Sequence, residues 1–138
     1  MLVELWAVFE SGIVEIAKYL QKEEGYSIGI EDLRASNDFE RAQIYYDRVL
    51  RFPLIISDDV KARLNVLLLV RNAVAHSNGR IEVIKKNRLS MIQDWEKKHG
   101  GISTDGDYLN LTAAFVETMA QTVKTSLDDL IARVKEKH

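Results

Sequence analysis

The segment from residue 60 to residue 75 limits the fold of this chain more than any other. It reads VKARLNVLLLVRNAVA, and the apolar run from Leu67 to Val70 leaves no continuous polar face. A helix of this kind is stable only where other elements cover it on several sides. The sequence therefore predicts a central helix that is buried by its neighbours. Its longest apolar run, Val66 to Val70, is far too short to cross a bilayer, so we expect no membrane association.

The residues on either side of this segment mark where the helix begins and ends. Ser57 is a favourable N-cap, and Asp58 and Asp59 suit the positive end of the helix dipole. Asn78-Gly79 is a common left-handed helix stop. We therefore expect the central helix to run from about residue 58 to about residue 77.

Apolar residues recur at three- and four-residue steps elsewhere in the chain, which is the pattern of amphipathic helices. The helices predicted in this way cover about residues 2–24, 37–52, 82–98 and 112–134. Gly25 closes the first of them. Asn37 and Glu40 form the capping box of the second, which Pro53 ends, and Thr112 opens the last.

The chain also predicts a small β-hairpin before the last helix. Ile102 and residues 108–111 flank the turn signal Asp105-Gly106. The last helix then carries its apolar residues on one face, namely Phe115, Met119, Val123, Leu127, Leu130, Ile131 and Val134. The expected fold is all-α, an antiparallel bundle of four to five helices with one small β-hairpin near residues 102–111.

The composition is typical of one soluble domain. The chain has 138 residues, 46% hydrophobic and 29% charged, which suits a single domain over residues 1–138. It has no cysteine, which excludes disulfides, thiolate metal sites and a cysteine nucleophile. Its net charge is −2, so a contact with nucleic acid must use a local patch. Glu4 and Glu10 near the start do not fit a secretion signal, so we expect a cytoplasmic location.

Three polar residues, Arg71, Asn72 and His76, stand at the end of the apolar helix. Arginine is rarely buried without a partner. Leaving its charge unpaired in the interior costs on the order of several kcal/mol. An internal polar network, a second subunit or a substrate must therefore satisfy these side chains.

The stretch from Arg71 to His76 resembles the signature of HEPN domains. In that family an arginine is followed, usually at once, by a polar residue and then by a histidine, late in a central helix of a four- or five-helix bundle. Here four residues separate Arg71 from His76, and Asn72 holds the polar position. The motif is short, but the helical plan around it extends over the whole chain.

The resemblance implies a metal-independent endoribonuclease that acts as a homodimer, with two motifs facing each other across one cleft. His76 would be the general acid or base in the attack of a ribose 2′-hydroxyl on the adjacent phosphate. Arg71 would stabilise charge on the phosphorane, and Asn72 would orient His76 or the phosphate. The implied products end in a 2′,3′-cyclic phosphate and a 5′-hydroxyl, with no cofactor. Such a protein would be a toxin or a defence effector with an antitoxin partner.

Helix geometry favours a site that two subunits share. At roughly 100° per residue, Asn72 and His76 lie on one stripe, whereas Arg71 and His76 are about 140° apart. A second copy of the helix would help to bring these side chains together.

A local basic patch follows the motif in the sequence. Residues 80–88 contain four cations and one acid, Glu82. The predicted substrate-binding residues are Asn78 and these cations, Arg80, Lys85, Lys86 and Arg88. The alternative for that patch is an ordinary solvated helix face.

Two other functions stay open. A non-catalytic module for nucleotide sensing or protein interaction would share the fold and bind phosphate without turnover, and a purely structural polar network is part of that alternative. Other HEPN proteins are partners of a small nucleotidyltransferase, and these often have a tyrosine two residues after the histidine. Asn78 stands there in this chain, which counts against a nucleotidyltransferase partner.

The remaining conspicuous residues are expected to be structural. The aromatic residues Trp6, Tyr45, Tyr46 and Trp95 are predicted to be core or helix-packing residues, and His99 and His138 to lie at the surface. Asp105-Gly106-Asp107 is predicted to be a turn, since it lacks the downstream acid of a calcium loop. No spacing of histidines or acids predicts a metal site.

Overall fold

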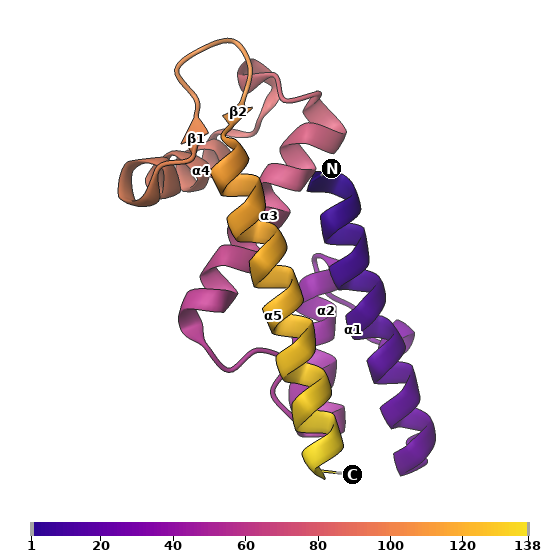
Figure 1. Cartoon of the computed structure of the whole chain (residues 1–138). Coiled ribbons are helices and arrows are strands. Elements are labelled where there is room, and N and C mark those ends of the chain that lie inside the picture. The colour runs from indigo at the N-terminus through magenta and orange to yellow at the C-terminus, as the bar shows by residue number, and fades with distance from the viewer. Residues whose placement is uncertain (1, 138) are drawn as a thin grey trace.

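Five helices and one short hairpin make up the computed structural model of the protein, which describes residues 2–137 (Figure 1). The helices are α1 (Leu2–Glu24), α2 (Asp38–Tyr45), α3 (Asp58–Ser77), α4 (Lys86–His99) and α5 (Ala113–Lys137). The strands β1 (Ile102–Ser103) and β2 (Asn110–Leu111) pair antiparallel. The predicted all-α bundle with a small hairpin is confirmed. The expectation for His138 lies outside the described residues.

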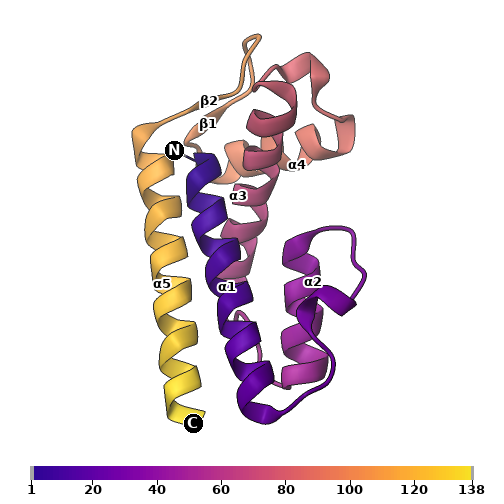
Figure 2. The same cartoon turned by 90° about the vertical axis from the view of Figure 1, so that its right-hand side faces the viewer.

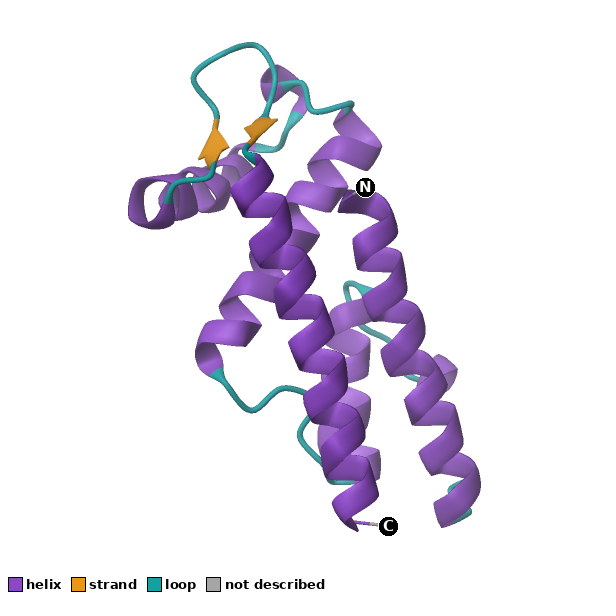
Figure 3. Ribbon diagram, in the orientation of Figure 1, coloured by secondary structure: helices purple, strands orange, loops and turns teal. Residues whose placement is uncertain are grey.

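The long helices run along a common axis, and α4 lies across it. Helices α1 and α5 are neighbours that run in the same direction, and α3 runs against both (Figures 1 and 2). Helix α2 packs on α1 to one side of this group (Figure 2). The hairpin lies at the end of the bundle where α3 finishes and α5 begins (Figure 3).

Helix α3 is the central helix, as its apolar sequence predicts. It packs against α1, α4 and α5, and its buried residues are Leu64, Val66, Leu67, Val70 and Ala73. The side chain of Ser57 accepts a hydrogen bond from the N–H of Val60 at 3.3 Å. Asn78 ends the helix in the left-handed conformation, with a φ of 52°. Both predicted helix signals are therefore confirmed.

Aromatic side chains join α1 to α2 and to the turn that follows it. The ring of Phe39 meets that of Trp6 edge-on, with the centroids 5.6 Å apart. The buried hydroxyl of Tyr46 donates to the carbonyl of Ile13 at 2.6 Å, and burial raises the pKa of this tyrosine. Tyr45 is buried as well. The prediction of a core position is confirmed for Trp6, Tyr45 and Tyr46.

Two helix boundaries differ from the sequence-based expectation. Residues Ile81–Val83 form a separate 3-10 turn, and α4 begins only at Lys86, where Lys85 at the N-cap offers no side-chain acceptor. Helix α2 ends at Tyr45 and continues as a single π-helical turn, Tyr46–Leu50. That turn ends at Arg51, which takes a φ of 54°, before Pro53 is reached.

The expectation that Ile131 faces the core is wrong. Its side chain is 41% exposed, whereas the preceding Leu130 is buried. Successive helical residues point about 100° apart. Ile131 therefore falls on the outer side of α5, where it lines a shallow groove with Ile16 and Tyr19 of α1.

Within residues 2–137, no helix is both long and apolar enough to cross a membrane.

Candidate functional site at the end of the central helix

The predicted catalytic residues lie in the last two turns of α3, Asn78 and Arg80 follow in the loop after it, and the other predicted cations lie at the start of α4. The helix stops where the N–H of Asn78 bonds the carbonyl of Ala73. The following backbone is tied to the hairpin, because the N–H of Leu109 donates to the carbonyl of Gly79 at 2.6 Å. The loop after the motif is therefore held by hydrogen bonds on both sides.

Arg71 is half-buried and is held by its neighbour in the chain. Its Nη1 donates a hydrogen bond of 2.9 Å to the side-chain oxygen of Asn72. Its Nε is buried and has no hydrogen-bond partner among the described residues. Asn72 thus orients the guanidinium of Arg71 in the single chain, whereas the resemblance implied contact with His76 or phosphate.

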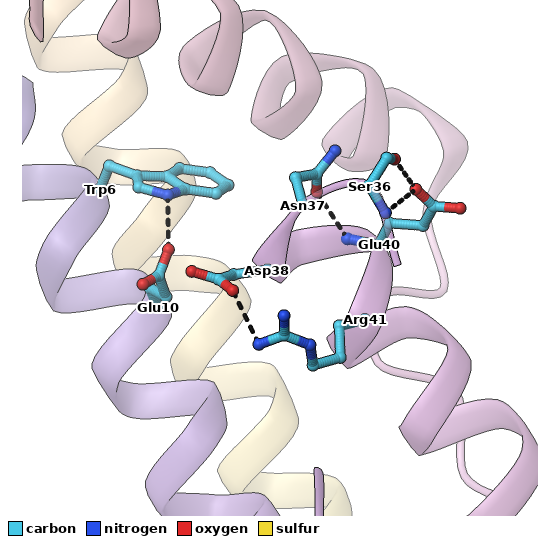
Figure 4. A network of polar contacts seen from close by, with 7 residues as sticks. All are labelled: Trp6, Glu10, Ser36, Asn37, Asp38, Glu40 and Arg41. Atoms are coloured by element: carbon cyan, nitrogen blue, oxygen red, sulfur yellow. Dashed lines mark hydrogen bonds and ion pairs between the residues drawn. The ribbon is translucent and has the colours of Figure 1, made fainter. Parts of the chain in front are cut away.

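A group of charged side chains from α1 and α2 accompanies Arg71. Glu10 accepts a hydrogen bond from the indole N–H of Trp6 at 3.0 Å, and Asp38 is paired with Arg41 at 2.9 Å. Figure 4 shows the carboxyl groups of Glu10 and Asp38 turned toward each other from the two helices. Together with Arg71, this group contains two acids and two cations.

The environment of Glu10 favours its protonated form. Burial raises the pKa of the Glu10 carboxyl, and the neighbouring charge of Asp38 raises it further. The Trp6 hydrogen bond and the positive charge of Arg71 act in the opposite direction. Arg71 is thus electrostatically coupled to a carboxyl group from α1, which periodicity along α3 could not reveal.

His76 has different surroundings from Arg71. It is exposed, and its side chain has no hydrogen bond or ion pair among residues 2–137. It follows Asn72 by one turn on the same stripe of α3, as predicted. The single chain does not bring His76 into contact with Arg71, in keeping with their expected angular separation on one helix.

The cations that follow the motif are exposed but not equivalent. Arg80 forms an ion pair with Glu82 at 2.6 Å, which neutralises part of the predicted patch. Lys85, Lys86 and Arg88 at the start of α4 are exposed and have no ion pair within the described chain. Asn78 serves as the α3 cap through its backbone, and its side chain is exposed.

Tyr108 lies near the motif although the sequence did not mark it as a site residue. Its backbone pairs with that of Arg80 in an isolated antiparallel bridge, and the residue is 54% exposed. An exposed ring beside a cation can stack on a nucleobase. The hairpin was predictable, but its docking on the loop after α3 is a long-range contact that local sequence patterns do not encode.

Within residues 2–137, no three histidine, aspartate or glutamate side chains are arranged to hold a metal ion.

Comparison with protein-family models, curated proteins and solved structures finds no match for this chain. The relation to HEPN domains therefore remains a prediction that rests on the Arg71–His76 motif and on its position in a central helix.

Proposed function

We propose that this protein is a homodimeric cytoplasmic endoribonuclease with Arg71, Asn72 and His76 at its active site. One contrast within a single helix carries the proposal: Arg71 is half-buried and held by Asn72, while His76 is exposed and has no partner among residues 2–137. A free imidazole can move the proton of a ribose 2′-hydroxyl, and a fixed cation can stabilise the charge that develops on the phosphate.

The proposed reaction divides the chemistry between these groups. His76 removes the proton of a ribose 2′-hydroxyl, whose oxygen bonds to the adjacent phosphorus as the bond to the 5′-oxygen breaks. The leaving oxygen takes a proton from a second acid, a role that the other copy of His76 fills in a dimer. Arg71 stabilises the charge on the phosphorane, since its guanidinium is permanently charged and forks onto phosphate. The products end in a 2′,3′-cyclic phosphate and a 5′-hydroxyl.

The exposed cations support binding of the RNA backbone. Lys85, Lys86 and Arg88 extend from the region of the motif along the start of α4. Each phosphate contact would make binding weaker as salt rises. An RNase of this kind would act as a toxin or defence effector, restrained by an antitoxin.

A non-catalytic scaffold is the second candidate, and the network on α1 and α2 favours it. The charge of Arg71 acts on the Glu10 carboxyl of α1, which in turn lies beside Asp38 of α2, as it would if Arg71 served only to hold helices together. A sensing or interaction module would then keep the fold without turnover.

Cleavage of end-labelled RNA in EDTA tests the proposal. The wild-type protein should yield fragments with cyclic phosphate ends, and chelation should leave the rate unchanged. Arg71→Lys keeps the charge but loses the fork, so it should remain folded and cut at least about tenfold more slowly. Arg34→Lys, at an exposed position in the loop before α2, is the matched control. Loss of cleavage in EDTA that magnesium restores would contradict the mechanism.

A further inference from the structure

A second site lies at the opposite end of α3 from the motif. A cavity of about 540 Å³ opens between the first turns of α3, the end of α4 and the start of α5. Its size falls within the range of small-molecule and cofactor sites. Arg63 and Asp59 of α3 line it, together with Trp95 and His99 of α4.

The cationic side of this cavity is available to a ligand. The Arg63 side chain is half-buried and has no hydrogen bond or ion pair within residues 2–137, although Asp59 stands one turn before it on α3. Thr112, Ala114 and Thr118 of the α5 region line the same cavity, where the N–H of Phe115 is already bonded to the Thr112 hydroxyl. The Arg63 guanidinium suits a phosphate group, which arginine binds through two parallel hydrogen bonds.

The aromatic side of the cavity comes from a pair of stacked rings. The ring centroids of Trp95 and His99 are 4.0 Å apart, with 33° between the planes. Both residues line the cavity, and Trp95 is half-buried and packs against the core, as a helix-packing residue is expected to do. Indole and imidazole faces bind nucleobases by stacking without selecting a particular base.

Hydrogen bonds and one close backbone approach join the segments that form the walls of the cavity. The hydroxyl of Thr104 donates to the Glu96 carboxylate at 2.6 Å, which ties the end of α4 to the hairpin. The N–H of Thr112 donates to the carbonyl of Gly101 at 2.9 Å. A Cβ on Gly101 would stand only 3.0 Å from that of Phe115, so the chain passes close to α5 there. A preformed site loses less freedom on binding.

We infer that this cavity binds a mononucleotide. The base stacks on the outer face of the Trp95–His99 pair, Arg63 holds the phosphate, and the Asp59 carboxylate accepts from the ribose hydroxyls. Each of the three parts of a nucleotide thus meets a group of matching chemistry in one cavity. The site is separate from Arg71 and His76 and does not depend on the proposed cleavage of RNA.

Calorimetric titration of the full chain with AMP, adenosine, ribose 5-phosphate and inorganic phosphate tests this inference. AMP should bind with a Kd below about 1 mM, and tighter than any of its parts. Arg63→Ala should weaken AMP and ribose 5-phosphate at least about tenfold and leave adenosine unchanged. Trp95→Leu should weaken AMP and adenosine by about 5- to 100-fold, the scale of base stacking, and leave ribose 5-phosphate unchanged.

The controls separate this site from the rest of the molecule. Arg34→Ala and Tyr19→Leu change an exposed arginine and an exposed tyrosine elsewhere, and both should bind AMP normally. His76→Ala should also bind AMP normally, whether or not the protein cuts RNA. Arg63→Lys and Trp95→Phe, checked by thermal unfolding, replace the larger changes where those destabilise the fold.

Three results would overturn the inference. The first is the absence of AMP binding at 1 mM, a concentration within the range of weak specific ligands. The second is phosphate binding as tight as that of AMP, which would show an anion site without base recognition. The third is AMP binding that Arg63→Ala and Trp95→Leu leave intact or that His76→Ala abolishes, since the nucleotide would then bind elsewhere.

Discussion

Asn72 accepts a hydrogen bond of 2.9 Å from the guanidinium of Arg71, although the two residues are adjacent in α3. Neighbouring residues on a helix point about 100° apart, so this contact requires the long arginine side chain to bend around the helix. The bond fixes where the charge of Arg71 lies. It also explains why a short polar residue directly after the arginine is useful in such a motif.

The Arg71–Asn72 bond gives the first prediction. Asn72→Ala should leave the fold intact at a cost of about 0.5–1.5 kcal/mol, the usual net value of one hydrogen bond. RNA cleavage should fall about tenfold, because Arg71 would lose its one hydrogen-bond acceptor among the described residues. Asn72→Asp should restore activity, and Gln121→Ala on exposed α5 serves as the control. Unchanged cleavage by Asn72→Ala would show that this bond does not prepare the site.

The second prediction concerns the pH dependence of stability at Glu10. Its pKa is raised above the ordinary value of 4.5, so at pH values between 4.5 and the raised value the folded state holds more of this proton than the unfolded state does. Stability from this group is therefore lost as pH rises from about 4.5 through the raised value. Glu10→Gln keeps an acceptor for the Trp6 N–H and should be more stable than wild type at pH 7.

Urea unfolding at pH 4 and at pH 7 measures this difference. The advantage of Glu10→Gln should shrink toward zero at the lower pH, where the wild-type carboxyl is protonated in both states. Glu23→Gln, an exposed acid near the end of the same helix, is the control. A Glu10→Gln variant that is less stable at pH 7 would show that attraction to Arg71 outweighs burial and Asp38.

The central position of α3 gives the third prediction. Leu67 is completely buried, so Leu67→Ala should destabilise the protein by about 2–5 kcal/mol through lost contacts and the cavity left behind. Met91→Ala removes a side chain that is 54% exposed and should change stability by less than about 0.5 kcal/mol. Denaturant unfolding compares the two. Equal effects would be incompatible with a buried central helix.

The fourth prediction concerns assembly. One chain leaves Arg71 and His76 apart on α3, so the proposed site needs a second copy. Light scattering at tens of micromolar should report twice the 15.8 kDa mass of the chain. A monomer mass over the whole concentration range would remove the shared site and, with it, the second histidine that protonates the leaving oxygen.

The sequence predicted those parts of the fold that depend on neighbours along the chain. Ser57 and Thr112 each accept a hydrogen bond from a backbone N–H three residues ahead, which is the local geometry of a cap. The start of α4 was not predictable in this way, because Lys85 at its N-cap makes no side-chain cap. Helix limits could thus be predicted where a side chain sets them.

The sequence could not predict which side chains meet from different helices. Glu10 and Arg71 are far apart in the chain, and no periodicity connects them. Trp95 and His99 share one face of α4, but their cavity forms only where that helix meets α3 and α5. Such contacts depend on how helices pack, whereas the Arg71–His76 motif could be found because it lies within one helix.

The most direct test compares wild type with His76→Ala on end-labelled RNA in the presence of EDTA. Because His76 is exposed and has no partner within residues 2–137, its removal should leave folding and dimer mass unchanged. The account predicts wild-type cleavage to cyclic phosphate ends and a loss of rate by about 10² to 10⁴ in the variant, the usual scale of acid–base catalysis. An intact His76→Ala dimer that cuts RNA at the wild-type rate, or a wild-type dimer that cuts no RNA, would contradict it.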